Sequence, residues 1–477
     1  MARHAVPAVP LSRLAEVVGA GIVGDAGTTV TGLTQDSRSV APGDLYCAVR
    51  GERHDGRRFI SDAVAAGAVA VLTDDAGVEA HGAGLVVVDD VRAALGPLAA
   101  AAFGHPSERL TMIGVTGTNG KTSVAWMIGA IMRAAGRRVE VRGTLSGERT
   151  TPEAIDIHAS LASSVAAGTD TVVMEVSSHA LAMHRVDGIM FDLAVFTNLG
   201  RDHLDFHGST EAYFAAKAIL FDGSHSRLAV ANIDDVHGRL LIDAHPARVS
   251  PCSLADAFDV STTVDRCSFT WRSVRVDVPM GGGFTVVNAV VAASAAARLG
   301  IDTATIARGL AGMDPVPGRF EPVDNAAGVG IVVDYAHTAD GLRAVLASAR
   351  ALTEGRVIVV FGCGGDRDRG KRPAMGRAAL EGADTVVVTS DNPRTEDPMA
   401  IIGEVLSGMG DRANDAIVEP DRRAAIASAI SLAARGDIVV IAGKGHESTQ
   451  EVAGEFLPFN DVDEARNAAA RMTGGRA

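Results

Sequence analysis

The chain has 477 residues, of which 47% are hydrophobic, and this length and composition are typical of two to four globular domains with a core in each. Its formal net charge of −14 excludes the broad basic face that binding to a nucleic-acid backbone requires, so any anionic ligand must be met by local cations or metal ions. No apolar run approaches the ~20 residues of a membrane span and no signal-like segment opens the chain, so we expect no membrane insertion and a cytoplasmic location.

Residues 1–107 are predicted to form a small α/β unit. The pattern indicates a helix at 11–18 and short strands at 45–49, 68–73 and 84–88. This unit also contains the triplet Asp36, Ser37 and Arg38 and a polar loop at 51–56. Taken alone, such a triplet is usually a turn with a solvated salt bridge, so the unit by itself does not indicate a function.

A second predicted unit, residues 108–315, opens with the strongest motif of the chain. A buried strand at 110–115 runs into Gly-Thr-Asn-Gly-Lys-Thr at 117–122, which then opens a helix. This is the shorter variant of the phosphate-binding loop, whose backbone N–H groups turn toward an anion at the helix N-terminus. Lys121 can reach the β- and γ-phosphates and Thr122 can bind Mg2+. A ligand-free strand-turn-helix corner is the alternative, but such a corner needs no Lys-Thr pair.

Polar clusters follow two later strands of this unit. Strands are predicted at 171–176, 193–197 and 227–232, and ligands of open parallel sheets lie at the carboxyl ends of the strands. Glu175 and His203, which follow the first two strands, are reasonable oxygen and nitrogen ligands for a divalent cation beside a triphosphate.

Lys217 is the only charged residue of an apolar helix at 213–221, which we expect to be capped near Ser209 or Thr210. A buried lysine beside a metal is costly unless it is neutralised, modified or paired. The usual alternative for a single lysine in such a helix is snorkelling to the surface.

A Pro-Val-Pro-Gly-Arg segment at 315–319 is predicted to be a hinge or domain boundary. Beyond it, in residues 316–477, four apolar strands at 331–333, 357–361, 385–389 and 438–441 alternate with helical segments, which predicts a doubly wound domain. Each strand runs into a polar motif: Asp-Tyr-Ala-His, Gly-Cys-Gly-Gly-Asp-Arg-Asp, Asp-Asn-Pro-Arg and Gly-Lys-Gly-His-Glu. Four such motifs on one sheet edge indicate a ligand site.

These motifs, in this order along essentially the whole chain, resemble the Mur ligases, and among them the type that adds the third amino acid to the peptidoglycan precursor. The resemblance implies an α/β protein of three domains: a small α/β N-terminal domain (1–107) that binds UDP-N-acetylmuramate, a central P-loop ATPase-like parallel sheet (108–315) that binds ATP, and a C-terminal Rossmann-like domain (316–477) that binds the amino acid. A monomer that uses small-molecule substrates is expected.

The resemblance also implies roles for individual residues. The uridine nucleotide end of the substrate is expected at Ser37, Glu52, Arg53 and His54, and the muramoyl-dipeptide end at Thr150, Thr151, Ser177 and Arg185. ATP is expected at Gly117, Thr118, Asn119, Gly120, Lys121, Thr122, Ser123, Asn288, Arg319 and Asp334. The implied Mg2+ ligands are Thr122, Glu175, His203 and Lys217, the last as a carbamate formed with CO2. Lys121, Lys217, Glu175, His203 and Arg319 are therefore the expected catalytic residues.

Relatives commonly have Phe-Asn where this chain has Phe284 and Thr285, although the second asparagine, Asn288, is present.

The third substrate can be argued from charge. The resemblance places it at Arg367, Asp391, Asn392, Pro393, Arg394, Gly443 and Glu447. Meso-diaminopimelate ends in an ammonium and a carboxylate, whereas lysine ends in an ammonium alone. Arg367 and Arg394 can pair with a carboxylate and Glu447 with an ammonium, and an arginine would repel the bare ammonium of lysine. The expected reaction passes through an acyl phosphate formed with ATP. A lysine-adding or folylpolyglutamate-type ligase is one alternative, and a non-catalytic nucleotide-binding regulator is another.

Overall fold

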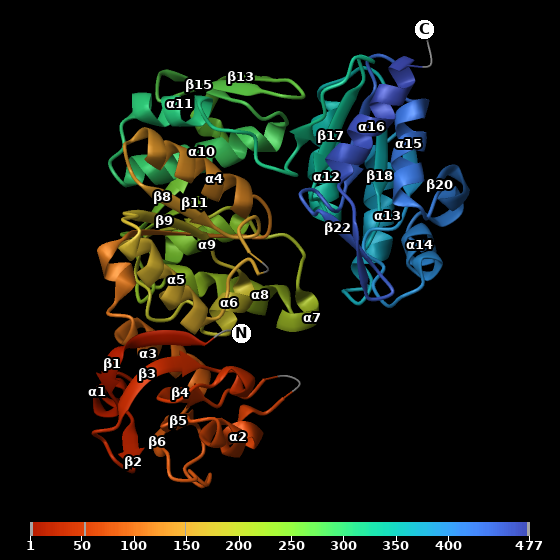
Figure 1. Cartoon of the computed structure of the whole chain (residues 1–477). Helices are drawn as coiled ribbons and strands as arrows, with labels where there is room; N and C mark the ends of the chain where they lie inside the picture. Colours follow the sequence, from red (N-terminus) through yellow and green to blue (C-terminus); the bar gives the residue numbers. More distant parts are fainter. Residues whose placement is uncertain (1–2, 52–53, 148, 475–477) are drawn as a thin grey trace.

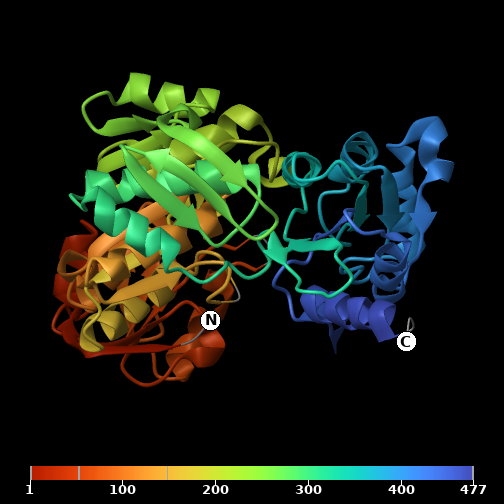
Figure 2. The same cartoon turned by 90° about the horizontal axis from the view of Figure 1, so that it is seen from above.

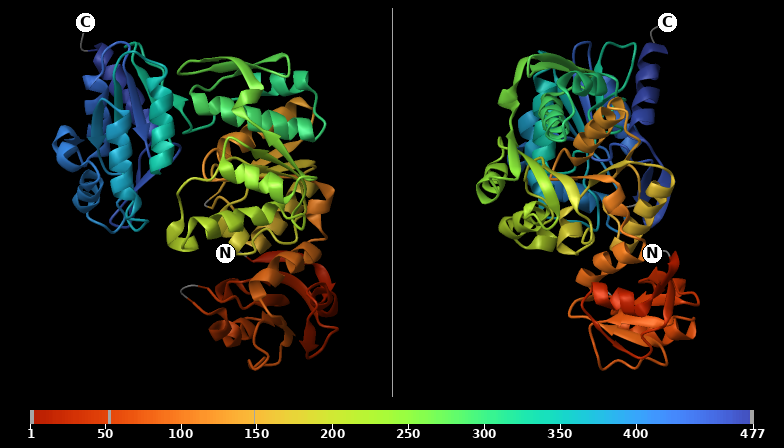
Figure 3. Two further views of the ribbon diagram at one scale, coloured as in Figure 1. Left: turned by 180° about the vertical axis from the view of Figure 1, so that it is seen from behind. Right: turned by 90° about the vertical axis from the view of Figure 1, so that its left-hand side faces the viewer.

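The computed structural model describes residues 3–51, 54–147 and 149–474, which fold into three α/β parts (Figure 1). The N-terminal part lies at one end of the central part, and the C-terminal part lies beside it (Figures 2 and 3). No helix among the described residues is long and apolar enough to span a membrane.

The N-terminal part is a six-stranded sheet with parallel inner strands and an antiparallel strand at each edge. Its strands, in spatial order, are β1 (His4–Pro10), β3 (Thr29–Thr34), β4 (Asp44–Cys47), β5 (Ala70–Thr73), β6 (Gly84–Val87) and β2 (Gly21–Val23). Its helices are α1 (Leu11–Val17), α2 (Ile60–Ala65) and α3 (Val91–Ala102). The predicted helix and three predicted strands are confirmed to within two residues at each end, whereas β1, β2 and β3 were not predicted.

The central part contains a fully parallel six-stranded sheet with helices on both faces. The strands, in spatial order, are β12 (Val249–Cys252), β11 (Ser226–Asn232), β10 (Phe191–Phe196), β7 (Thr111–Thr116), β9 (Thr171–Glu175) and β8 (Val139–Arg142). The helices are α4 (Lys121–Ala134), α5 (Ala154–Ala166), α6 (Ser178–Ala182), α7 (Leu204–His207), α8 (Thr210–Ala218), α9 (Val236–Ala244), α10 (Gly283–Arg298) and α11 (Thr303–Ala311). Since β9 and β10 flank β7, the polar segments after these three strands lie together at one sheet edge.

A small antiparallel sheet, which was not predicted, packs on the α10 side of the central part. It consists of β13 (Ala257–Thr262), β14 (Cys267–Trp271) and β15 (Val274–Val278). Its buried residues, including Phe269 and Trp271, join the core beneath α4 and α10.

The C-terminal part is the doubly wound sheet that the sequence predicts. The strands, in spatial order, are β16 (Glu321–Pro322), β17 (Gly330–Asp334), β21 (Ile438–Ala442), β18 (Val357–Phe361), β19 (Thr385–Val388) and β20 (Ile417–Val418), and all but β16 are parallel. Helices α12 (Ala339–Arg350), α13 (Lys371–Gly382) and α14 (Pro398–Ser407) cover one face, and α15 (Arg422–Leu432) and α16 (Asp461–Gly474) cover the other. A hairpin of β22 (Thr449–Val452) and β23 (Glu455–Pro458) follows β21.

Close backbone contacts join the parts. Gly96 of α3 lies against Asp187 of the central part so closely that an added Cβ would be 2.1 Å from the Asp187 carbonyl oxygen. Gly318, with φ +66°, lies equally close to the backbone of Gly445 and His446. The N–H of Arg201 donates to Asp340 at the start of α12 (3.2 Å). The loop after β10 therefore contacts the C-terminal part next to the phosphate loop.

Candidate active site

A cavity of about 410 Å³ lies between the phosphate loop and the C-terminal part. Its walls come from the segment 118–123, the ends of β9 and β10, helix α10, the segment after β17, and α12. The central part contributes Thr118, Asn119, Gly120, Lys121, Thr122, Ser123, Thr144, Thr150, Glu175, Asn198, Asp202, His203, Phe284, Val287 and Asn288. The C-terminal part contributes Arg319, Asp334, Tyr335, Ala336, His337, Gly341, Ala344 and Val345. The cavity is therefore a candidate site for a nucleotide between two domains.

The phosphate loop is held open by two glycines and by the neighbouring strand. Gly117 has φ +145° and Gly120 has φ +86°, and added Cβ atoms would lie 1.9 Å from Thr197 Oγ1 and 2.6 Å from Asn288 Oδ1. Thr197 Oγ1 donates to the Asn119 carbonyl (2.6 Å), which fixes the loop against the end of β10. The tight packing leaves no room for side chains at either glycine.

Lys121 begins α4 and folds back over the loop. Its Nζ donates to the carbonyls of Gly117 (3.0 Å) and Thr118 (2.9 Å). Burial lowers the pKa of this ammonium. Thr122 and Ser123 follow it, and both are buried in the first turn of the helix. An anion at this helix start would meet the lysine and the helix dipole together.

Glu175, at the end of β9, is the centre of a hydrogen-bonded group. Its Oε2 accepts from Thr122 Oγ1 (3.1 Å) and from Thr144 Oγ1 (3.2 Å), and its Oε1 accepts from the Thr144 N–H (2.9 Å). Thr144 Oγ1 also contacts Thr150 Oγ1 (3.1 Å). Thr144 was not predicted, although its position just after β8, next to β9, was a usable signal. Arg319 Nη2 reaches the same group from the C-terminal part and donates to Thr122 Oγ1 (3.0 Å).

The predicted metal ligands are only partly joined by contacts. Thr122 and Glu175 share a hydrogen bond, and their oxygens are the hard donors that suit Mg2+. His203 also lines the cavity, with φ +54° and its ring 3.4 Å from Asp202, and burial lowers its pKa. Among the described residues, no group of three or more His, Cys, Asp or Glu side chains is arranged to hold a metal.

Lys217 is fully buried in α8, so the snorkelling alternative is wrong. The helix is capped by Ser209, as predicted. Lys217 Nζ donates to the Gly117 carbonyl (2.8 Å), which is the acceptor that Lys121 also uses, and lies 4.5 Å from the Tyr213 ring centre. Burial, together with the positive charge of Lys121, lowers the pKa of Lys217 well below its usual value. Burial and the neighbouring cation therefore both disfavour the charged form of Lys217.

The C-terminal wall is built around Arg319 and Asp334. The Arg319 guanidinium stacks on Tyr335, 4.5 Å from the ring centre. Asp334 accepts from the N–H groups of Phe320 (2.8 Å) and Ala336 (2.7 Å), and burial raises its pKa. Thr285 lies in α10 and donates to the Gly281 carbonyl (2.5 Å), so its hydroxyl is engaged by the backbone just before the helix.

The residues predicted for the dipeptide end of the substrate lie together beside Glu175. Thr151 Oγ1 donates to the Glu175 carbonyl (2.9 Å) and accepts from the Ser177 N–H (3.0 Å). Arg185 donates to the Thr151 carbonyl (3.1 Å) and pairs with Glu153 (2.9 Å). Thr150 lines the cavity.

The residues predicted for uridine lie apart, in the N-terminal part. Ser37 begins a 3-10 turn (Ser37–Ser39), in which Asp36 pairs with the exposed Arg38 (2.8 Å). His54 is exposed, and Glu52 and Arg53 lie outside the described residues.

The residues predicted for the amino acid are gathered where the loops after β18, β19 and β21 meet. Arg394, with φ +53°, pairs with Glu451 (3.1 Å) and donates to the Gly365 carbonyl (2.6 Å), and the next residue toward the N-terminus, Pro393, lies against the same glycine. Asp391 lies against Gly443. Arg367 is exposed.

Asn392 Nδ2 donates to Glu447 Oε2 (2.8 Å), and the buried Lys444 also contacts both residues. Lys444 was not assigned a role from the sequence, although its motif was identified.

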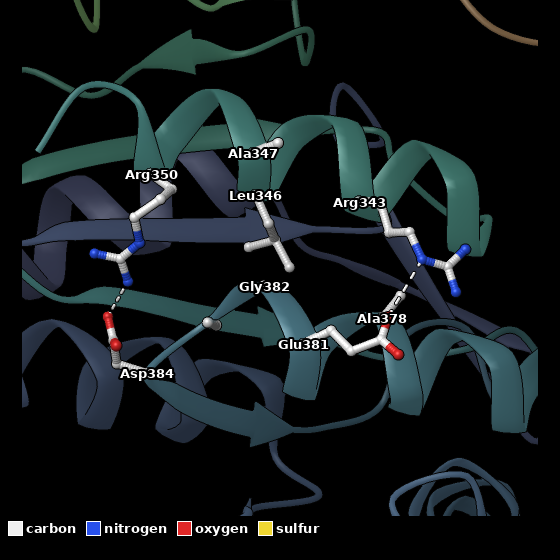
Figure 4. A pocket seen from close by; sticks show the side chains of 9 residues that line it. Arg343, Leu346, Ala347, Arg350, Ala378, Glu381, Gly382 and Asp384 are labelled. Atoms are coloured by element: carbon white, nitrogen blue, oxygen red, sulfur yellow. Dashed lines mark hydrogen bonds and ion pairs between the residues drawn. The ribbon is translucent and has the colours of Figure 1, made fainter.

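A groove of about 480 Å³ between α12 and α13 lies outside this site (Figure 4). Its two arginines are already paired, Arg343 with Glu381 (3.5 Å) and Arg350 with Asp384. Its floor contains Leu346 and Gly382. The groove therefore offers no free charge to a ligand.

Comparison with known proteins extends over most of the chain. Family models match residues 29–103 (Mur ligase family, catalytic domain), 115–296 (Mur ligase middle domain) and 318–445 (Mur ligase, glutamate ligase domain). The UDP-N-acetylmuramoyl-L-alanyl-D-glutamate--2,6-diaminopimelate ligase of Streptomyces coelicolor is 43% identical, over 98% of each chain. The Solibacter usitatus protein of the same name is 44% identical, over 92% of this chain and 94% of the relative. A solved structure with that name aligns over 98% of this chain and 100% of its own, with 34% identity and a TM-score of 0.69.

Proposed function

The chain belongs to the Mur ligase family, and from this premise we propose that it joins meso-2,6-diaminopimelate to UDP-N-acetylmuramoyl-L-alanyl-D-glutamate, with consumption of ATP, in peptidoglycan precursor synthesis. The observation that carries the proposal is the contact of Arg319, from the C-terminal part, with Thr122 of the phosphate loop (3.0 Å). Arg319 therefore lies beside the phosphate loop that carries Lys121, so each domain would supply one cation where the γ-phosphate of a nucleotide would lie. A monomer suffices, because one chain supplies every residue assigned here.

The three parts divide the substrates among them. Residues 1–107 would hold the uridine end, through Ser37 and the Glu52, Arg53 and His54 loop, and residues 108–315 would hold ATP. Residues 316–477 would hold the amino acid. ATP and a nucleotide-linked sugar are substrates of the cytoplasm, so we place the reaction there.

The chemistry follows from the weakness of a carboxylate as an electrophile. The γ-carboxylate of the D-glutamyl residue attacks the γ-phosphorus of ATP, the bond to the β-phosphate oxygen breaks, and an acyl phosphate and ADP form. The amine of the amino acid then attacks the acyl carbon, loses a proton and displaces phosphate. Lys121 and Arg319 would neutralise the charge of the transferred group, which is the main task of a protein in phosphoryl transfer.

Magnesium and a modified lysine fit the central part. Thr122, Glu175 and His203 would hold Mg2+, which supplies charge neutralisation for the triphosphate. We propose that the neutral amine of Lys217 attacks the carbon of CO2 and loses a proton to give a carbamate, which would place an anion beside Lys121. The shared Gly117 carbonyl and the lowered pKa of Lys217 support this proposal.

Diaminopimelate is favoured over lysine by the arginines of the C-terminal loops. We propose that Arg394 and Arg367 receive the distal carboxylate and that Glu447 receives the distal ammonium. Asp391, Asn392, Pro393 and Gly443 shape the loops between them. A lysine substrate would bring no carboxylate to Arg367 and would place an ammonium near both guanidinium groups.

The test is ADP release by the purified protein with ATP, UDP-N-acetylmuramoyl-L-alanyl-D-glutamate and one amino acid at a time. We expect turnover with meso-diaminopimelate and at most weak turnover with lysine or glutamate. Equal turnover with lysine would contradict the choice of amino acid. Tight ATP binding without turnover for any amino acid would support a nucleotide-binding regulator instead.

A further inference from the structure

Lys444 is a lysine with a fully buried side chain at the centre of the amino-acid loops, and the reaction as described gives it no role. It follows β21 in the motif Gly-Lys-Gly-His-Glu and has no exposed side-chain surface. Its Nζ donates to Asn392 Oδ1 (3.0 Å), Glu447 Oε2 (2.9 Å) and the Thr449 carbonyl (2.7 Å). All three protons of an ammonium are therefore used, which is the condition for burying this charge at low cost.

The backbone around Lys444 is built to turn this side chain inward. Gly443 has φ +116°, and an added Cβ there would lie 2.5 Å from Asp391 Oδ2. Gly445 has φ +51°, and an added Cβ would lie 2.8 Å from the Gly318 carbonyl oxygen and from Tyr335 Cβ. Because both flanking positions need glycine, the inward direction of Lys444 is a property of the loop.

The Glu447 carboxylate is engaged through only one of its oxygens. Oε2 accepts from Lys444 Nζ and from Asn392 Nδ2 (2.8 Å), and Asn392 is itself fixed by the Glu451 N–H (2.9 Å). Within the described chain, Oε1 accepts no hydrogen bond, and 31% of the side chain is exposed. The carboxylate is therefore locked in orientation, with one oxygen left for a ligand.

Two other buried cations of this domain, Arg422 and Arg372, pair with carboxylates that have no assigned role in substrate binding. Arg422 pairs with Asp461, and neither side chain has exposed surface. Arg372 pairs with Glu396 (2.7 Å) and Glu404 (2.9 Å), which lie outside the assigned amino-acid residues. Only Lys444, among these three, has as its anionic partner a residue assigned to the substrate.

We propose that Lys444 is a positioning residue, which orients Glu447 so that Oε1 receives the distal ammonium of the amino acid. This inference rests on the proposed function and adds to it a determinant of amino-acid affinity. The carboxylate bridges two cations in the complex, Lys444 on Oε2 and the substrate on Oε1. A charge-assisted hydrogen bond is directional, so loss of the contact between Lys444 and Glu447 would weaken binding of the substrate ammonium and leave the ATP cavity unaffected.

The experiment compares Lys444→Met with wild type in the ADP-release assay. We expect the KM for diaminopimelate to rise about tenfold, the size expected for one charge-assisted hydrogen bond, with the KM values for ATP and the UDP-linked substrate unchanged. Lys444→Gln keeps an N–H donor and should have an intermediate KM, and it also serves if Lys444→Met folds poorly. Arg435→Met, which removes an exposed cation of the same domain, is the matched control and should behave as wild type.

A double-mutant cycle separates positioning from a general loss of structure. In a Glu447→Gln background, Lys444→Met should change the KM for diaminopimelate by less than about twofold, because the group it orients is already gone. A full tenfold effect in that background, or a parallel rise in all three KM values, would overturn the inference. A wild-type enzyme that does not use diaminopimelate would instead overturn the proposed function.

Discussion

Replacing Gly117 with alanine tests the phosphate loop with a single added methyl group. The position has φ +145°, a region that L-residues rarely adopt, and the new Cβ would lie 1.9 Å from Thr197 Oγ1 and 3.0 Å from the Asn198 carbonyl oxygen. The Thr197 hydroxyl would have to move, which breaks its hydrogen bond to the Asn119 carbonyl (2.6 Å). The perturbation therefore acts on the loop from two sides.

The free-energy cost of Gly117→Ala has two parts, the backbone strain and the lost hydrogen bond. Strained backbone of this kind costs about 1–3 kcal/mol, and one lost hydrogen bond costs about 0.5–1.5 kcal/mol. Their sum is about 1.5–4.5 kcal/mol, which corresponds to about a 10- to 2,000-fold weaker affinity if the loop regains its shape only when ATP binds. Turnover should fall as well, because the Gly117 carbonyl is the shared acceptor of Lys121 and Lys217.

The assay is calorimetric titration with ATP, together with ADP release at saturating ATP. Gly136→Ala is the matched control, since Gly136 follows the same helix, has φ +82° and has no heavy atom within 4 Å of an added Cβ. The control carries backbone strain without the clash, so we expect lower thermal stability with normal ATP affinity. A Gly117→Ala protein that binds ATP within threefold of wild type would refute the assignment of this loop to the triphosphate.

Three further predictions concern Lys217, Arg319 and Asp187. Wild-type enzyme incubated with 13C-bicarbonate should show an NMR signal from a carbamate carbon, and Lys217→Met should not. The signal should weaken as the pH falls, because only the neutral amine reacts with CO2. Full activity without this signal would contradict the carbamate. Arg319→Lys removes the donation to Thr122 and the stacking on Tyr335 and should lower kcat by about 10²- to 10³-fold, whereas Arg272→Lys, which alters an arginine stacked at the same 4.5 Å on Trp271, should leave kcat unchanged. Asp187 lies at the junction with the N-terminal part and accepts from His184 (2.8 Å) and His225 (3.2 Å). Despite the burial of Asp187, these contacts lower its pKa. The hydrogen bond to Asp187 in turn raises the pKa of His184. The ionised Asp187 contributes stability above a pH of about 4, and the protonated His184 contributes it below about 6.5. The melting temperatures of wild type and Asp187→Asn should therefore differ most between these pH values, and the difference should shrink as the pH rises further. A difference that does not depend on pH would contradict this reasoning.

The inner parallel strands of the C-terminal part were predictable because each is a short apolar run that stops at a polar motif. β17, β18, β19 and β21 were predicted to within two residues at each end, since strands buried on both faces need no polar alternation and end where ligand-binding loops begin. The same reasoning located Glu175 after β9.

The sheet of β13, β14 and β15 was missed for a local reason. β14 has the alternation of a half-buried strand, with Cys267, Phe269 and Trp271 buried. Its two-residue turn to β15 is Arg272 and Ser273, both with positive φ (45° and 63°). Turns of that shape usually contain Asn-Gly or Asp-Gly, so the sequence lacked the usual signal for a hairpin.

The candidate site was predictable as a set of residues but not as a set of contacts. Lys444 resembles an ordinary surface lysine in the sequence, whereas in the structure it is buried and hydrogen-bonded through its ammonium. Glu447 was expected to pair with a substrate ammonium, and the structure shows that one of its oxygens already accepts from Asn392 and Lys444. The contact of Glu447 with Asn392 joins residues from different loops, so local patterns do not encode it.

The Gly117 carbonyl connects the nucleotide loop to the proposed modification. It accepts from two buried lysines, Lys121 at 3.0 Å and Lys217 at 2.8 Å, and two ammonium groups on one acceptor repel each other in a medium that screens poorly. Lys121 lines the cavity, where a triphosphate would stabilise its positive charge, whereas Lys217 does not line it. Lys217 is therefore the lysine that should lose its proton, and a neutral amine at this position can react with CO2. The shared carbonyl therefore links the loop expected to bind phosphate to the lysine proposed to be modified.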